Sequence, residues 1–186
     1  LMALSKITTE SLLDGEITAA KFATGAVAFP HTVQTHVIVA TTQTISANTI
    51  TNLTGLNATI TPTSGTKILI TIRWTGEGPS VSSQDAVFGI RRDSTDIGNP
   101  DAASSRRVAL AQLLPGYVAA DAASTCDSVM YQYLDSPSTG SAITYHATIN
   151  HRDAGTLYNQ RTVDDTDNNT HERLTSTITL QEVVAP

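Results

Sequence analysis

The sequence predicts an all-β protein, an antiparallel β-sandwich, and three observations lead to this fold class. The 186 residues include 30 Thr and 16 Ser, whereas charged residues make up only 15%. This composition suits short strands joined by polar turns better than long surface helices. Apolar and polar residues alternate in several short runs, which is the pattern of a half-buried strand. The intervals between these runs hold Gly, Pro, Asn, Asp and Ser, the residues that form turns.

Residues 1–30 differ in composition from the rest and are expected to form a separate segment, extended or partly helical. Asp14-Gly15 marks a turn within it. Its apolar residues recur about every five positions and are too few to bury a core of their own: Ile7, Leu12, Leu13, Ile17 and Phe22. The segment therefore needs copies of itself or a partner surface, and residues 31–186 are expected to fold as the main domain.

About eight short strands are expected from residue 31 onward. The clearest is Lys67–Trp74, whose even-numbered residues are apolar and fall on one face of the strand. We therefore expect Ile70, Ile72 and Trp74 to be buried. Leu110–Leu114 could instead form a short helix. The other expected strands are Val33–Thr41, Thr49–Pro62, Ala86–Arg92, Arg106–Leu114, Asp127–Leu134, Ile143–His151 and Thr175–Val184.

Charge and cysteine content exclude several function classes. A net charge of -6 argues against nucleic acid as a partner, because a phosphate backbone requires a Lys/Arg surface. No apolar run approaches the length of about 18 residues that a membrane span needs, so no membrane insertion is expected. Cys126 is the only cysteine, which excludes an internal disulfide and a cysteine zinc site.

No motif in the sequence indicates catalysis, a metal or a cofactor. The five histidines lack the i, i+4 spacing of metal ligands on a helix, and no G-x-S-x-G element occurs. Residues 165–169 begin like a calcium loop but lack its Gly and its Glu at the required positions, which favours a solvated polar loop. Arg91-Arg92 and Arg106-Arg107 lie among aspartates, so internal pairing is favoured over an anion site. We predict a protein that is not an enzyme.

The N-terminal run ITTESLLDGEITAAKFATGAV resembles the leading segment of bacteriophage tail-fibre and virion structural proteins. Those proteins carry repeats of the form I-x-x-x-S-L-x-D-G-x-I-x-x-A-K-L/F. Four downstream stretches are similar, in order and spacing, to a family common among phages of aquatic bacteria: 50–72, 88–107, 133–149 and 173–183. The resemblance implies a C-terminal jelly-roll head similar to the trimeric tumour-necrosis-factor and complement type. It implies no catalytic residues.

The resemblance also implies a function and a location. The chain is expected to be a short homotrimeric fibre that residues 1–30 attach to other phage virion proteins of the tail, neck or capsid. It would be made in the host cytoplasm and assembled into the phage particle, where the head would meet a host surface glycan or protein. The alternative is a head-decoration or neck protein that stabilises the particle and binds no receptor. A polysaccharide depolymerase is the least favoured reading, because such tailspikes are usually long β-helices.

Physical arguments support a trimer independently of the resemblance. The chain has only nine aromatic residues and hence a modest core. Three copies would cover one another's sheet faces and strand edges. They would also let three copies of residues 7–27 supply one another's missing core.

Loops that follow alternate strands of an antiparallel sandwich gather at one end. The expected strand directions place loops 76–85, 115–126 and 151–173 at the end farthest from the N-terminal segment. Loops 93–105 and 135–142 are expected at the opposite end. Loops of this kind are free to vary and to bind. The distal loops supply rings and polar groups as binding candidates: Tyr117, Tyr158, Asn159, Arg161, Asp165 and Asp167.

Overall fold

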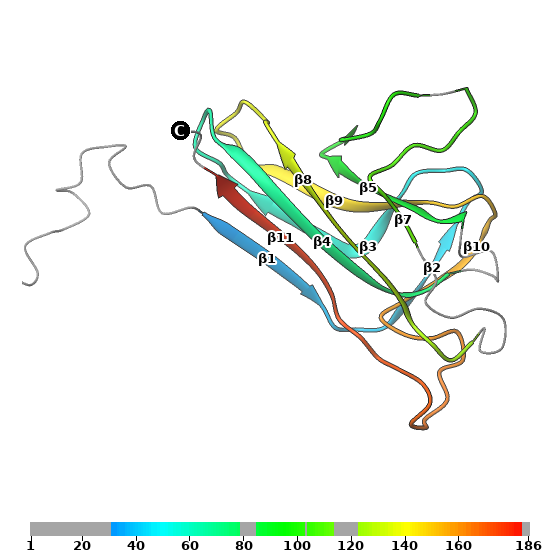
Figure 1. Ribbon diagram of the computed structural model, residues 1–186. Helices are drawn as coiled ribbons and strands as arrows, with labels where there is room; N and C mark the ends of the chain where they lie inside the picture. The colour runs from blue at the N-terminus through cyan, green and yellow to red at the C-terminus, as the bar shows by residue number, and fades with distance from the viewer. Residues whose placement is uncertain (1–30, 79–84, 103, 114–122, 184–186) are drawn as a thin grey trace, which may run out of the picture. The chain divides into compact units, whose positions relative to one another are not determined.

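The computed structural model describes residues 31–78, 85–102, 104–113 and 123–183. Within these ranges the chain forms two antiparallel β-sheets that pack face to face, with no helix (Figure 1). The predicted all-β sandwich is therefore confirmed. The expectations for residues 1–30 lie outside the described residues.

The first sheet has six strands in the order β1-β11-β4-β10-β2, with β8 on the free side of β4. β4 is the centre of this sheet because β8 pairs along nearly its whole length, whereas β11 pairs with its first part and β10 with its last two residues. The strands are β1 (Thr32–Val37), β2 (Thr41–Ile45), β4 (Lys67–Glu77), β8 (Asp127–Asp135), β10 (Gly155–Asn159) and β11 (Ser176–Val183).

The second sheet has five strands in the order β3-β9-β5-β6, with β7 also on β5. They are β3 (Thr51–Ile60), β5 (Val87–Arg92), β6 (Thr95–Ile97), β7 (Ala111–Gln112) and β9 (Ile143–Asn150). Pairing is nested across the chain: β1 with β11, β3 with β9, β4 with β8, and β5 with β7. This nesting is the jelly-roll arrangement, a long antiparallel ribbon rolled into two sheets.

The core lies between the two sheets and follows from the period-two pattern. Ile68, Ile70, Ile72 and Trp74 are completely buried, which confirms the burial predicted for this strand. The Trp74 ring meets Phe88 of the opposite sheet with ring centroids 5.1 Å apart. Alternate residues of β4 point away from the core because successive side chains of a strand face opposite sides.

Several elements differ from the expectation. The strand expected over 33–41 stops at Val37, where its partner β11 begins, and Thr41 starts a separate strand, β2, which was not expected and pairs with β10. The strand expected over 106–114 is reduced to Ala111–Gln112, and no helix forms over its described residues up to Leu113. β6 and β10 were not expected, because each has a single apolar position inside a short polar run, Ile97 and Leu157.

At one end of the sandwich, here called the His31 end, the start of β1 lies beside the last residues of β11. The backbone N–H of Glu182 donates to the His31 carbonyl over 2.8 Å. Glu182 is buried, and its carboxylate accepts hydrogen bonds from the Thr63 N–H (2.7 Å) and the Thr66 hydroxyl (2.8 Å). This side chain therefore ties the turn between β3 and β4 to the last strand.

The hydrogen bonds of Glu182 predict a pH-dependent stability. Burial by itself favours the neutral acid, but the bonds from Thr63 and Thr66 outweigh it and hold the pKa of Glu182 below its ordinary value. A lowered pKa adds stability above the unfolded-state pKa of about 4.3, and this stability is lost as the pH falls through the folded-state pKa.

Glu182→Gln should therefore cost about 1–3 kcal/mol at pH 7, as expected when hydrogen bonds to a buried charged group are lost. The difference between wild type and variant should begin to shrink as the pH falls below the unfolded-state pKa of about 4.3, and it should be lost only below the lowered folded-state pKa, where Glu182 is neutral in both states. Urea unfolding of both proteins at pH 7 and pH 3 measures it. A difference that is equal at the two pH values would show that ionisation of Glu182 does not stabilise the fold.

Candidate functional site

The end of the sandwich opposite His31, here called the loop end, gathers the described parts of the three loops expected there. Strand register brings Gly76 beside Asp127 and Asn150 beside Val87. The Cys126 N–H donates to the Glu172 carboxylate over 3.2 Å. The β10–β11 connection extends at this end as the orange loop of Figure 1. The gathering of these loops is thus confirmed for the residues described.

Tyr158 and Asn159 lie in strand β10 rather than in a loop, and alternation sends their side chains to opposite faces. Asn159 is only 1% exposed, and its side-chain oxygen accepts a hydrogen bond from Trp74 Nε1 over 2.9 Å. Its expected exposure at the surface is therefore wrong: Asn159 is a core residue. Tyr158 is half-buried. Tyr117 and the anchor candidates Ile7, Leu12, Leu13, Ile17 and Phe22 lie outside the described residues.

The Tyr158 ring is covered on one side by Arg161, whose guanidinium carbon lies 5.2 Å from the ring centroid. The same guanidinium donates to the carbonyls of Thr162 (2.9 Å) and Val163 (2.8 Å). Arg161 therefore fixes the start of the β10–β11 loop. The covered face of Tyr158 is not available for stacking against a sugar ring.

Asp165 lies between two arginines and closes the loop. Arg161 donates to its carboxylate over 3.2 Å, and Arg173 donates to both carboxylate oxygens, over 2.9 and 2.6 Å. The backbones of Arg161 and Arg173 also form an isolated antiparallel bridge. Asp165 is thus a structural link of the loop, and its charge is offset by two cations.

Two further residues that the sequence did not single out hold the base of this loop. The buried Glu77, at the end of β4, accepts a hydrogen bond from the Val163 N–H over 2.6 Å. Gln160, with φ of 60°, donates to the Ser176 hydroxyl over 2.7 Å. The only sequence signal of Glu77 is that a carboxylate closely follows the apolar run of β4. This signal does not reveal that Val163 is its hydrogen-bond partner.

The outer part of the loop presents polar groups to solvent. The pKa of Asp164 is held below its ordinary value, chiefly because the Thr166 hydroxyl donates to its carboxylate over 2.6 Å. Asp167 and Asn169 are exposed, and the former lines an open hollow together with Glu172 and Arg173. Such carboxylates, amides and cations can bind hydroxylated or amine-bearing groups through hydrogen bonds.

Cys126, the cysteine at this end, is not poised to act as a nucleophile. Burial, followed by the carboxylates of Glu172, Glu77 and Asp127, raises the pKa of the Cys126 thiol to about 12, so the thiolate is scarce. In the part of the chain that the structure describes, no group of three or more His, Cys, Asp or Glu side chains is placed to hold a metal ion.

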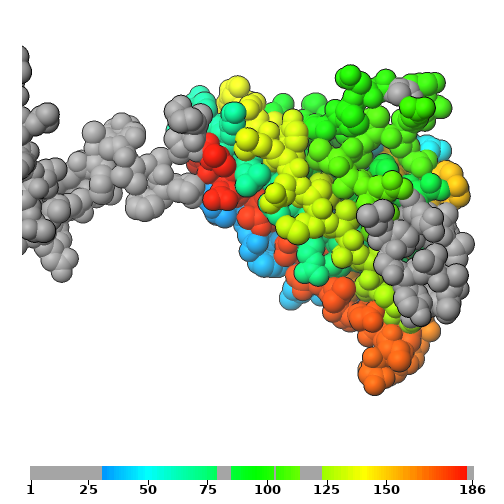
Figure 2. Space-filling view, in the orientation of Figure 1, coloured from blue at the N-terminus to red at the C-terminus, as the bar shows by residue number. Residues whose placement is uncertain are grey.

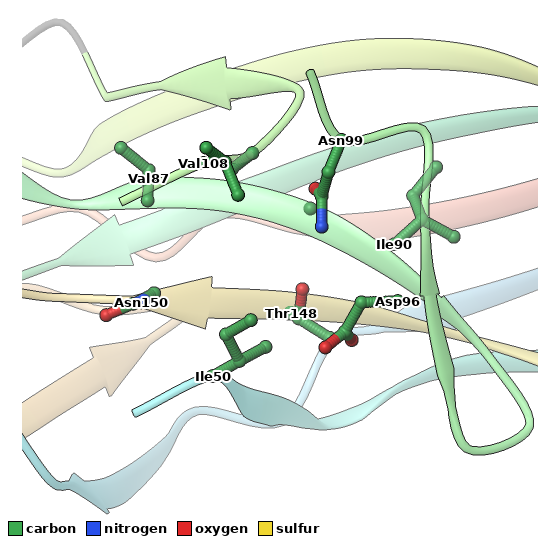
Figure 3. A pocket seen from close by; sticks show the side chains of 10 residues that line it. Ile50, Val87, Ile90, Asp96, Asn99, Val108, Thr148 and Asn150 are labelled. Atoms are coloured by element: carbon green, nitrogen blue, oxygen red, sulfur yellow. The ribbon is translucent and has the colours of Figure 1, made fainter. Parts of the chain in front are cut away.

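A small pocket lies on the second sheet, lined by Thr148 and Asn150 of β9, Val87 of β5, and Asn99 and Val108 (Figure 3). It has room for little more than a water-sized group, which excludes an organic ligand. Its Asp96 is already paired with Arg91 over 2.8 Å.

Three of the four arginines noted in the sequence form internal ion pairs. Besides the Arg91–Asp96 pair, Arg92 binds the buried Asp135 over 2.9 Å and Arg107 lies 3.6 Å from Asp85. Internal pairing is thus confirmed for these three arginines.

Comparison with protein-family models gives no match to this chain, and comparison with curated proteins gives none either. Among the described residues, no helix is long and apolar enough to cross a membrane.

Proposed function

We propose that this protein is a phage virion structural protein, a short homotrimeric fibre that is anchored by residues 1–30 and presents the jelly-roll head. The polarity of the head is the observation that carries the proposal. The chain enters the head at His31, beside the last residues of β11, whereas the β10–β11 loop lies at the opposite end. An anchor joined at one end leaves the other end free to meet a host surface glycan or protein.

The anchoring role is tested by deleting residues 2–29. The head holds the complete nested strand set, so the truncated chain should keep its β-rich circular dichroism spectrum and its cooperative unfolding. It should nevertheless be missing from purified phage particles. Truncated protein at normal copy number on the particles would contradict the anchor.

Receptor binding is tested on exposed residues that do not hold the loop together. Asp167→Ala combined with Asn169→Ala removes a carboxylate and an amide without touching the Arg161–Asp165–Arg173 link. The adsorption rate of phage carrying this double variant to host cells should fall at least about tenfold, the effect of about 1.4 kcal/mol of lost binding. Asp101→Ala, an exposed carboxylate of another loop, is the matched control and should leave adsorption unchanged.

A head-decoration or neck protein is the second candidate, and the self-contained bonding of the loop end favours it. Tyr158 is covered by Arg161, and Asp165 is shared by two arginines. For this function the Asp167 and Asn169 variants would adsorb normally, while particles lacking the protein would lose their DNA at lower temperature. Release of reducing sugar from host polysaccharide would instead indicate a depolymerase.

A further inference from the structure

The outward face of the six-stranded sheet is an extended polar surface built from β1, β11, β4 and β8, which lie side by side in Figure 2. The register aligns Gln34, Thr179, Thr71 and Gln132 in one row across the four strands. Gln34 donates to the Thr179 hydroxyl over 2.6 Å, and Gln132 donates to the Thr71 hydroxyl over 2.9 Å. These side chains are therefore ordered before any partner arrives, which lowers the entropy cost of binding.

In the three rows that cross all four strands, this face carries no carboxylate, although the chain has a net charge of -6. Arg73 is the one permanently charged residue of these three rows, and the exposed Lys67, paired with Val183, lies just beyond them. The rows comprise Thr32, Gln181, Leu69 and Leu134; Gln34, Thr179, Thr71 and Gln132; and His36, Thr177, Arg73 and Met130. Depletion of Asp, Glu and Lys together with the presence of Met and Arg is the composition of a protein interface. Two copies can approach here without repulsion between acidic groups.

The exposed large hydrophobic residues of the described chain all belong to this sheet or its connections. Met130 (66% exposed) and Leu134 (45%) lie on β8 at one edge. Ile38 (74%) and Val39 (67%) follow β1, the strand at the other edge. The order across these strands is β1, β11, β4 and β8. The two apolar patches therefore lie at opposite edges of the same sheet.

We propose that this face binds a second copy of the chain, with the Met130–Leu134 patch of one copy against the Ile38–Val39 patch of the next. A ring of identical subunits needs two unlike patches on each subunit, and opposite edges of one sheet provide them. The chain also enters the head at β1, so residues 1–30 of each copy lead into an edge strand of the sheet that makes the contact. The inference rests on the proposed homotrimer and assigns its contact surface.

The test measures the mass of the full-length chain at micromolar concentration by sedimentation. The wild-type chain should be a trimer. Met130→Glu combined with Leu134→Glu should raise the dissociation constant at least about a hundredfold, because it buries two unpaired charges. Ile38→Glu combined with Val39→Glu should do the same. Thr59→Glu, exposed on β3 of the other sheet, is the control and should stay trimeric.

Mixing the two double variants tests the pairing of unlike patches. Each variant alone should be monomeric, whereas the mixture should form a dimer, because one intact patch of each kind remains. Circular dichroism and Trp74 fluorescence check that the heads stay folded. Variants that remain trimers like the wild type would overturn the contact surface. A monomeric wild type whose sheet face is protected from hydrogen exchange by residues 1–30 would overturn the second copy as occupant.

Failure of the proposed function would give a different result. The chain would then form the trimer in solution with the same variant pattern, yet it would be absent from purified phage particles.

Discussion

Gly76→Ala should lower the stability of the head by about 4 kcal/mol or more, or prevent folding altogether. Gly76 has φ of +154°, and an added Cβ would lie 2.1 Å from the Tyr158 carbonyl oxygen and 2.8 Å from Cζ2 of Trp74. One contact is with backbone and the other with a buried ring, so neither can move away cheaply. Gly76 is also where β4 pairs with both β8 and β10.

Gly65→Ala is the matched control for this prediction. Gly65 also has a positive φ, +89°, but an added Cβ would meet nothing within 4 Å. This variant should cost only the conformational penalty, about 1–2 kcal/mol. Urea unfolding of the two variants separates the clash from the backbone preference. Equal losses of stability would show that β10 does not approach Gly76 this closely.

Trp74→Ala should cost about 3–5 kcal/mol, the range for removing a large buried side chain whose site cannot collapse. Trp74 is fully buried at the centre of the sandwich, against Phe88 of the opposite sheet. The change also leaves the buried side-chain oxygen of Asn159 without the indole N–H that donates to it. Both losses act in the same direction.

A second variant separates the lost packing from the lost hydrogen bond in Trp74→Ala, and a third serves as a surface control. Trp74→Phe keeps a ring in the core but removes the bond to Asn159, so its cost should be intermediate. Thr59→Ala changes an exposed residue of β3 and should cost less than about 1 kcal/mol. Equilibrium unfolding followed by circular dichroism measures all three, because the Trp74 variants lose the fluorescent ring. A loss below about 1 kcal/mol for Trp74→Ala would contradict the packing described here.

Strands with several apolar positions were predictable because their side chains alternate. The run from Ile68 to Trp74 identifies both a strand and its buried face without any partner. β10 was not predicted, because its five residues have one apolar position, Leu157, and their sequence pattern cannot be told from that of a polar loop. Its extended conformation is set by pairing with β2 and β4.

At the loop end, the partners of single side chains could not be predicted from the sequence either. Asp165 was correctly placed in a polar segment, but its two arginine partners follow from the backbone bridge between Arg161 and Arg173. Asn159 has the composition of a surface residue, and only the approach of Trp74, 85 positions away in sequence, makes it a buried acceptor.

The sequence by itself thus determined the fold class, the buried face of β4 and the gathering of the loops, because these depend on local alternation and on strand direction. The tertiary structure alone decided the nested pairing of β1 with β11, the internal bonding of the Arg161–Arg173 loop and the three carboxylate-free rows across the first sheet. Each of these depends on register between strands far apart in the chain. Local alternation fixes which face of each strand is buried, but the pairing partner and the register between distant strands are decided only when the two sheets pack together.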